Sequence, residues 1–172
     1  LARILFFNEF LQTDKIPKKM VFFLTKLKKS IDASLETHSH FKSINVNSAL
    51  TNGIEIIIYR YEELLKSIFH ELIHFHNLDF KYFTSSKQDS MISSYINTSH
   101  NVSNTNKYLL YEAITEALAN VLNTIYSIPI PIDSTTSDAS IKTLQKKFIH
   151  YFSNELLFSI FQISKILHIS HF

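Results

Sequence analysis

The chain has no cysteine among its 172 residues. This absence excludes a disulfide, a thiolate metal ligand and a cysteine nucleophile, so a metal site would have to use histidine and carboxylate side chains. Positive and negative charges are nearly balanced, with a formal net charge of only +2. Nucleic acid is therefore not expected as a partner. The apolar runs all stop well short of a membrane span, so we expect no transmembrane segment.

Nothing in the sequence resembles a signal peptide, and together with the missing thiols this indicates a cytoplasmic protein. The first residue is Leu1, which leaves room for an incomplete N-terminus and a lost targeting segment. Because 45% of the residues are hydrophobic, we expect residues 1–172 to fold as a single globular domain.

The most informative stretch reads His-Glu-Leu-Ile-His from His70 to His74, inside an apolar segment with helical periodicity from Glu62 to Asn77. Residues four apart lie only about 40° apart around a helix, so the two histidines project from one face and can bind one Zn²⁺ ion. Glu71 would then reach the metal-activated water and act as the general base. The alternative is a pair of core histidines with ordinary hydrogen-bond partners.

A second helix is predicted from Tyr108 to about Tyr126. Glu112, Glu116 and Asn120 lie four residues apart on one line of it, and like charges at that spacing repel, so they need a cation that a metal ion with its histidines would provide. The alternative is an exposed acidic edge, although neighbouring alanines favour the close approach of another helix. The predicted core face is separate and consists of Leu110, Ile114, Leu118, Val121 and Ile125.

The two motifs together resemble those of the zincin metallopeptidases, and within them the gluzincins. The resemblance implies that Glu112 is the third zinc ligand beside His70 and His74, with Glu116 as the first alternative ligand. It also implies that Glu116, one turn later, holds a ligand histidine, for which we favour His70. It covers two short helical segments and leaves the rest of the chain unmatched.

The implied activity is zinc-dependent hydrolysis of peptide bonds in a peptide or protein substrate, with Glu71 as the base. By the same resemblance, a group that stabilises the oxyanion comes from the C-terminal region, where His150 is a better candidate than Tyr151, which fits the apolar stripe. Tyr95 or His100 would be the next candidates. The alternative functions are a catalytically silent zincin fold that binds a protein partner, and a structural helical protein with an accidental motif.

Two residues near the motif have weaker assignments. Asp79, five residues past His74, either terminates the helix or contacts a ligand from outside the metal site. His76 points away from His74 around the helix and is not expected to be a ligand.

The expected fold is mainly α (α+β): a zincin-like helical domain with a small antiparallel β-hairpin sheet beside the histidine helix. The hairpin is expected to pair residues 41–49 with residues 54–59 through a turn at Asn52-Gly53, which holds the only glycine, and it either binds an extended substrate at its edge or merely covers the helix. The remaining segments are assigned as follows: a short helix from Ala2 to Leu11, an amphipathic helix from Ile16 to Leu35 with a lysine-rich face and no binding role, a long surface loop over 79–106 that is a lid or an insertion, and a largely buried C-terminal helical region over 137–172, either continuous or interrupted near Ser153-Asn154.

Overall fold

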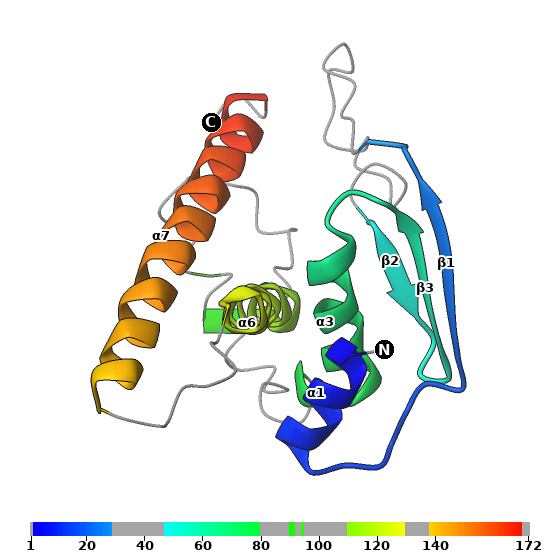
Figure 1. Cartoon of the computed structure of the whole chain (residues 1–172). Coiled ribbons are helices and arrows are strands. Elements are labelled where there is room, and N and C mark those ends of the chain that lie inside the picture. Colours follow the sequence, from blue (N-terminus) through cyan, green and yellow to red (C-terminus); the bar gives the residue numbers. More distant parts are fainter. Residues whose placement is uncertain are drawn as a thin grey trace.

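The computed structural model describes residues 2–28, 47–79, 90, 91, 94, 110–129 and 138–169. Within these residues the chain is mainly helical with one small mixed sheet, so the protein is of the α+β class, as the sequence predicts (Figure 1). Most of the expected surface loop over 79–106 lies outside them. The elements in chain order are α1 (Ala2–Leu11), β1 (Lys19–Thr25), β2 (Ala49–Thr51), β3 (Glu55–Arg60), α3 (Leu64–Phe75), α6 (Leu110–Ser127) and α7 (Asp138–Ile169).

The sheet has the strand order β1-β3-β2, with β1 parallel and β2 antiparallel to the central strand β3. The predicted hairpin is confirmed as the β2–β3 pair, but its first strand is Ala49–Thr51, later than the expected residues 41–49, of which 41–46 lie outside the described residues. The sheet is mixed rather than antiparallel, because β1 pairs with β3 in parallel. Gly53 in its turn adopts a φ of 80°, a left-handed conformation that costs glycine nothing sterically. The side-chain oxygen of Asn52 accepts hydrogen bonds from the backbone N–H groups of Ile54 and Glu55, which stabilises the turn.

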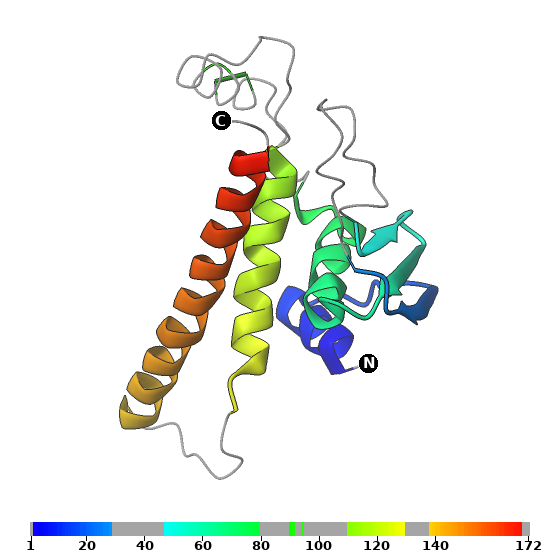
Figure 2. The ribbon, with the colours of Figure 1, turned by 90° about the horizontal axis from the view of Figure 1, so that it is seen from above.

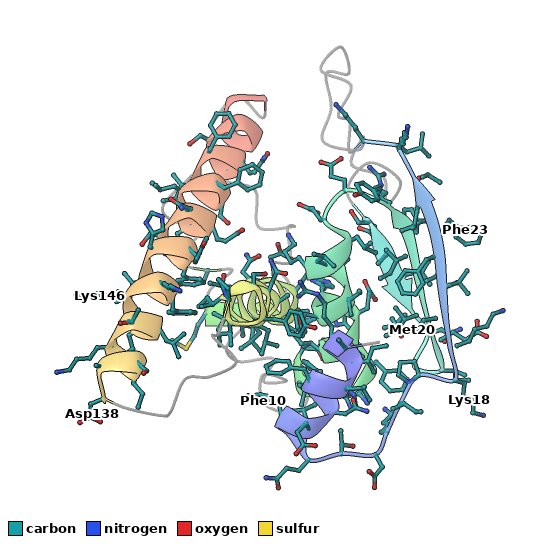
Figure 3. The ribbon with its side chains drawn as sticks, in the orientation of Figure 1. Phe10, Lys18, Met20, Phe23, Asp138 and Lys146 are labelled. Carbon is teal, nitrogen blue, oxygen red and sulfur yellow. The ribbon has the colours of Figure 1, made fainter. Side chains whose placement is uncertain are left out.

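The prediction of an amphipathic helix from Ile16 to Leu35 is wrong for the described residues, because residues 19–25 form β1. The run from Met20 to Thr25 is rich in β-branched and aromatic residues, which favour strands. The apolar residues of this run also recur at the spacing of a helix, which misled the prediction. Nothing in the local sequence indicates that the run pairs with β3. Phe23 points outward from the edge of the sheet (Figure 3) and is 64% exposed. Residues 29–35 lie outside the described part of the chain.

Helix α3 lies at the centre of the described core. One side of it packs on the sheet, where Ile56 and Ile58 of β3 are fully buried. Another side carries Phe69, whose ring contacts the rings of Phe6 in α1 and Tyr126 in α6. The predicted helices α1 and α3 are therefore confirmed. Contacts with α1, the sheet and α6 determine where the side of α3 that carries His70 and His74 points.

Helix α6 is confirmed, but its predicted core face is partly wrong. The buried residues that it contributes to the core include Ala119 and Leu122, whereas Leu118 and Ile125 are exposed. The buried side of α6 instead runs through Thr115, Ala119, Leu122 and Thr124, and the small side chains among them allow the close contact between α6 and α3.

Helix α7 is continuous over its 32 residues, so an interruption near Ser153-Asn154 is not observed. The expectation that much of it is buried is wrong, since Leu157, Phe158 and Phe161 are among its exposed residues. Figures 1 and 2 show α7 beside α6, with α3 on the opposite side of α6. Apolar residues occur all around α7, and within the described residues only one side of it has a neighbouring helix. None of the described helices combines the length and apolar character needed to cross a membrane.

Candidate metal centre

His70 and His74 lie one turn apart on α3 and face each other across a short gap. Their Nε2 atoms are 3.1 Å apart, and their rings are nearly perpendicular, with an interplanar angle of 73°. Both side chains are mostly buried, at 18% and 17% exposed. The helical spacing has therefore brought two imidazole nitrogens to one point, as a bidentate metal site requires.

Glu112 of α6 completes the cluster from the other helix. Its Oε1 lies 3.1 Å from Nε2 of His70, and its Oε2 lies 3.4 Å from Nε2 of His74. Among the described residues, these three side chains form a group that could hold a metal ion. Ligand atoms bonded tetrahedrally to Zn²⁺ at about 2.0–2.1 Å lie about 3.3 Å from one another. The observed spacings match that geometry, and two histidines with one glutamate are a donor set that zinc uses in catalytic sites.

The outer ring nitrogens of both histidines contact carboxylates. Nδ1 of His70 lies 3.2 Å from Oε2 of Glu116, and Nδ1 of His74 lies 2.7 Å from Oδ2 of Asp79. An Nδ1–H group that donates to a carboxylate leaves the Nε2 lone pair directed at the metal position. The contact between Glu116 and His70 is the pairing favoured from the sequence.

Asp79 reaches the site because of the way α3 ends. Asn77 adopts a left-handed φ of 54°, which asparagine tolerates better than most residues, and its N–H donates to the carbonyl of His74. The chain turns back there, and Asp79 lies fully buried against His74. Of the two roles considered for Asp79, contact with a ligand histidine is the one observed.

Lys66 is a further residue of the site, and its sequence context did not indicate this. Its Nζ lies 2.5 Å from Oε1 of Glu116 and 3.5 Å from Oε1 of Glu63. The available signal was its position one helical turn before His70, which places it on the histidine side of α3. A lysine in a lysine-rich chain did not stand out on that basis.

Burial and hydrogen bonding shift the proton affinities of the cluster. Hydrogen bonds from the two histidines hold the pKa of Glu112 well below its usual value. Burial alone would lower the pKa of His70, but hydrogen bonds to Glu112 and Glu116 outweigh it and raise that pKa to about 9. Burial raises the pKa of Glu71 to about 7, although the nearby histidines oppose the shift.

The cluster opens into a cavity of about 1020 Å³. Its walls come from β2 and the adjoining turn, from α3 and from α6, and Glu71 contributes to the lining although it is only 5% exposed. The volume is sufficient for a segment of a peptide next to the three candidate ligands.

The structure does not bring His150 to this site. It is exposed on α7, its ring contacts that of Tyr151, and neither residue lines the cavity. Helix α6 lies between α7 and α3, so it separates His150 from the two histidines (Figure 2). Tyr95 and His100 lie outside the described residues. His76 packs against the rings of Phe7 and Phe75 and is not in the cluster.

Comparison with known proteins gives no match to any family model, curated protein or solved structure. The assignment of this site therefore depends on its residues and their geometry.

Proposed function

We propose that this protein is a zinc metallopeptidase of the gluzincin type. The observation that carries the proposal is the convergence of Nε2 of His70, Nε2 of His74 and the carboxylate of Glu112 at tetrahedral ligand spacing. Independent support comes from the carboxylates of Glu116 and Asp79, which orient the two imidazoles for metal binding. Such an arrangement is more specific than the sequence motif, because a pair of core histidines needs neither a third converging ligand nor two orienting acids.

Zn²⁺, when bound, supplies a Lewis acid that polarises a carbonyl group and lowers the pKa of a water molecule towards about 7. Glu71 is the base in this proposal. Burial raises its pKa to about 7 in the metal-free protein, and such a carboxylate would be basic enough to take a proton from a water molecule at the metal position and then donate that proton to the leaving amine. Its place in the cavity lining, next to His70 in the chain, supports this role.

The proposed substrate is an extended peptide or a protein segment. Strand β2 is at an edge of the sheet and also lines the cavity. Within the described residues, no strand pairs with its outer side, so a substrate in an extended conformation could add as a strand and be held across the site. We propose a reducing, cytoplasmic setting for this activity, because the chain has no cysteine.

The test compares the protein with its Glu71→Gln variant, loaded with zinc, against a mixture of unstructured peptides. The variant should bind one zinc ion with unchanged affinity and lose turnover by several orders of magnitude, because it lacks the base but none of the ligands. Mass spectrometry of the peptides gives the cleavage rates, and metal analysis gives the stoichiometry.

Equal cleavage by the two proteins would rule out the proposed mechanism. Binding of zinc without any cleavage by the unmodified protein would favour the alternative of a silent zincin fold that binds a protein partner.

A further inference from the structure

The two acids that contact the candidate ligands have very different surroundings. Asp79 is fully buried, and its carboxylate is held close to His74 by the turn that ends α3. The side chain of Glu116 is 43% exposed and has three rotatable bonds, so packing alone does not fix its position. An exposed glutamate loses side-chain entropy when it is held in one conformation, and this cost must be offset by another contact.

Lys66 provides that contact. The two oxygens of Glu116 are divided between two partners, because Oε1 meets Nζ of Lys66 at 2.5 Å and Oε2 meets Nδ1 of His70 at 3.2 Å. Lys66 itself is only 17% exposed, and a second acid, Glu63, lies 3.5 Å from its Nζ. A charge pair in which one partner is mostly buried is screened by water less than a fully exposed pair, so its geometry is held more firmly.

The contact also separates the two glutamates of α6. Glu112 and Glu116 lie one turn apart on the same line of α6, and both contact His70, Glu112 at Nε2 and Glu116 at Nδ1. The ammonium group of Lys66 attracts Glu116 and relieves the repulsion between the two carboxylates. Among the described residues no lysine or arginine pairs with Glu112, whose oxygens instead face the two Nε2 atoms.

We propose that Lys66 is a positioning residue for the metal site: through Glu116 it keeps His70 oriented and leaves Glu112 as the carboxylate ligand. The inference rests on the proposed zinc site but not on peptidase activity. Lys66 contacts no ligand directly in this role, and its effect on the metal passes through one carboxylate.

The experiment measures Zn²⁺ affinity by competition with a chelator, and ligand geometry by the visible absorption spectrum of the Co²⁺-substituted protein. The variants are Lys66→Met, Lys66→Arg, Glu116→Gln and the double variant Lys66→Met with Glu116→Gln. The control is Lys146→Met, which removes an exposed lysine of α7 (Figure 3). Circular dichroism of each metal-free variant reports whether it folds.

Lys66→Met should weaken Zn²⁺ binding about 10-fold, at the lower end of the range for groups that orient a ligand histidine, and should alter the Co²⁺ spectrum. Lys66→Arg should restore most of the affinity, and Lys146→Met should have no effect. In the Glu116→Gln background, Lys66→Met should cause no further loss, because the path from Lys66 to the metal is already broken.

The proposal is overturned if Lys66→Met leaves affinity and spectrum unchanged, or if it weakens binding equally with and without Glu116. It is also overturned if Lys66→Met and Lys66→Arg both fail to fold while Glu116→Gln folds, because Lys66 would then act on the fold. If the unmodified protein binds no zinc, the metal site and this inference fail together. Zinc binding without peptide cleavage would instead remove only the proposed activity.

Discussion

At the scale of single residues, the candidate metal site depends on carboxylates that are not among its three candidate ligands. Asp79 lies 2.7 Å from Nδ1 of His74 and is fully buried. Its negative charge makes the imidazole a better electron donor and fixes which nitrogen carries the proton. The same contact gives one oxygen of a buried carboxylate its hydrogen-bond partner, whereas Oδ1 of Asp79 is buried without a partner among the described residues.

Replacing Asp79 by Asn is therefore expected to weaken Zn²⁺ binding by about 10–100-fold, because an amide can accept the same hydrogen bond but carries no charge. Chelator competition measures the change. His76→Ala, on the same helix end but outside the cluster, should leave the affinity unchanged. An Asp79→Asn protein that binds zinc as tightly as the original would show that His74 needs no charged partner.

The affinity for zinc should depend on pH, because the metal must displace a proton from Nε2 of His70. Hydrogen bonds to Glu112 and Glu116 overcome the effect of burial and raise the pKa of this histidine to about 9 in the metal-free protein. Below that pH the proton competes with the metal. The affinity should therefore rise with pH by about tenfold per unit for each displaced proton, and it should level off above about pH 9.

Isothermal titration in buffers of different ionisation enthalpy measures the number of protons released. Release near neutral pH is expected to exceed that of a site whose histidines keep their usual pKa. An affinity independent of pH from about 6.5 upward would contradict the raised pKa.

The candidate ligands could be predicted because helical spacing alone determines which residues share a face. His70 with His74, and Glu112 with Glu116, are pairs of this kind, and sequence reasoning selected them. The contacts of Lys66 and Asp79 could not be predicted in this way. That of Lys66 depends on how α6 docks on α3, and that of Asp79 depends on the turn at Asn77. His150 was chosen by resemblance, and nothing in its local sequence indicated which side of α6 its helix would occupy.

At the scale of elements, α3 connects the site to the core. The same helix carries the two histidines on one side and fully buried Phe69 on another. The Phe69 ring contacts Phe6 and Tyr126, and the guanidinium of Arg3 lies 5.0 Å from its centre. Three helices therefore meet at one aromatic side chain.

Phe69→Ala is expected to lower the free energy of unfolding by about 3–5 kcal/mol, the usual range for removal of a buried phenylalanine ring. Chemical denaturation of the metal-free protein measures it. Leu65→Ala is the control on the same helix, because Leu65 is exposed, and its effect should stay within about 0.5 kcal/mol. Similar losses for the two variants would mean that the aromatic cluster does not form.

Elements with strong local signals were predicted well, and those defined by distant partners were not. The hairpin was recognised from Asn52-Gly53, where the turn chemistry is local. Strand β1 was mistaken for a helix, because its parallel partner β3 is remote in the sequence and the residues around β1 contain no signal of that pairing. The buried side of α6 was partly misjudged because it includes Thr115 and Ala119, whose side chains do not stand out in the sequence as apolar core residues.

At the scale of the whole molecule, the metal site would join α3 and α6 in a chain that has no disulfide to do so. The ligands that it would link are far apart in the sequence, and α3 and α6 also share packed residues. An ion that binds only the folded arrangement stabilises it by mass action. At a free zinc concentration 100 times the dissociation constant, the gain is about 2.7 kcal/mol.

Zinc should therefore raise the melting temperature by roughly 5–10 °C at that concentration, given the usual sensitivity for a protein of this size. Differential scanning calorimetry with and without the metal measures the shift. Glu112→Gln should remove most of it, because the two histidines alone do not connect the helices. A full shift in that variant would move the third ligand to another residue, with Glu116 as the first candidate.

The division of the ligands between two helices also sets an order of assembly. His70 and His74 come into position as soon as α3 forms, and helix formation takes about a microsecond or less. Glu112 joins them only after α6 has docked, which requires the closure of a long intervening segment and is slower. If the site binds zinc as proposed, a folding chain would offer only two ligands until α6 docks and a complete set afterwards, so tight metal binding would report that α3 and α6 have already come together.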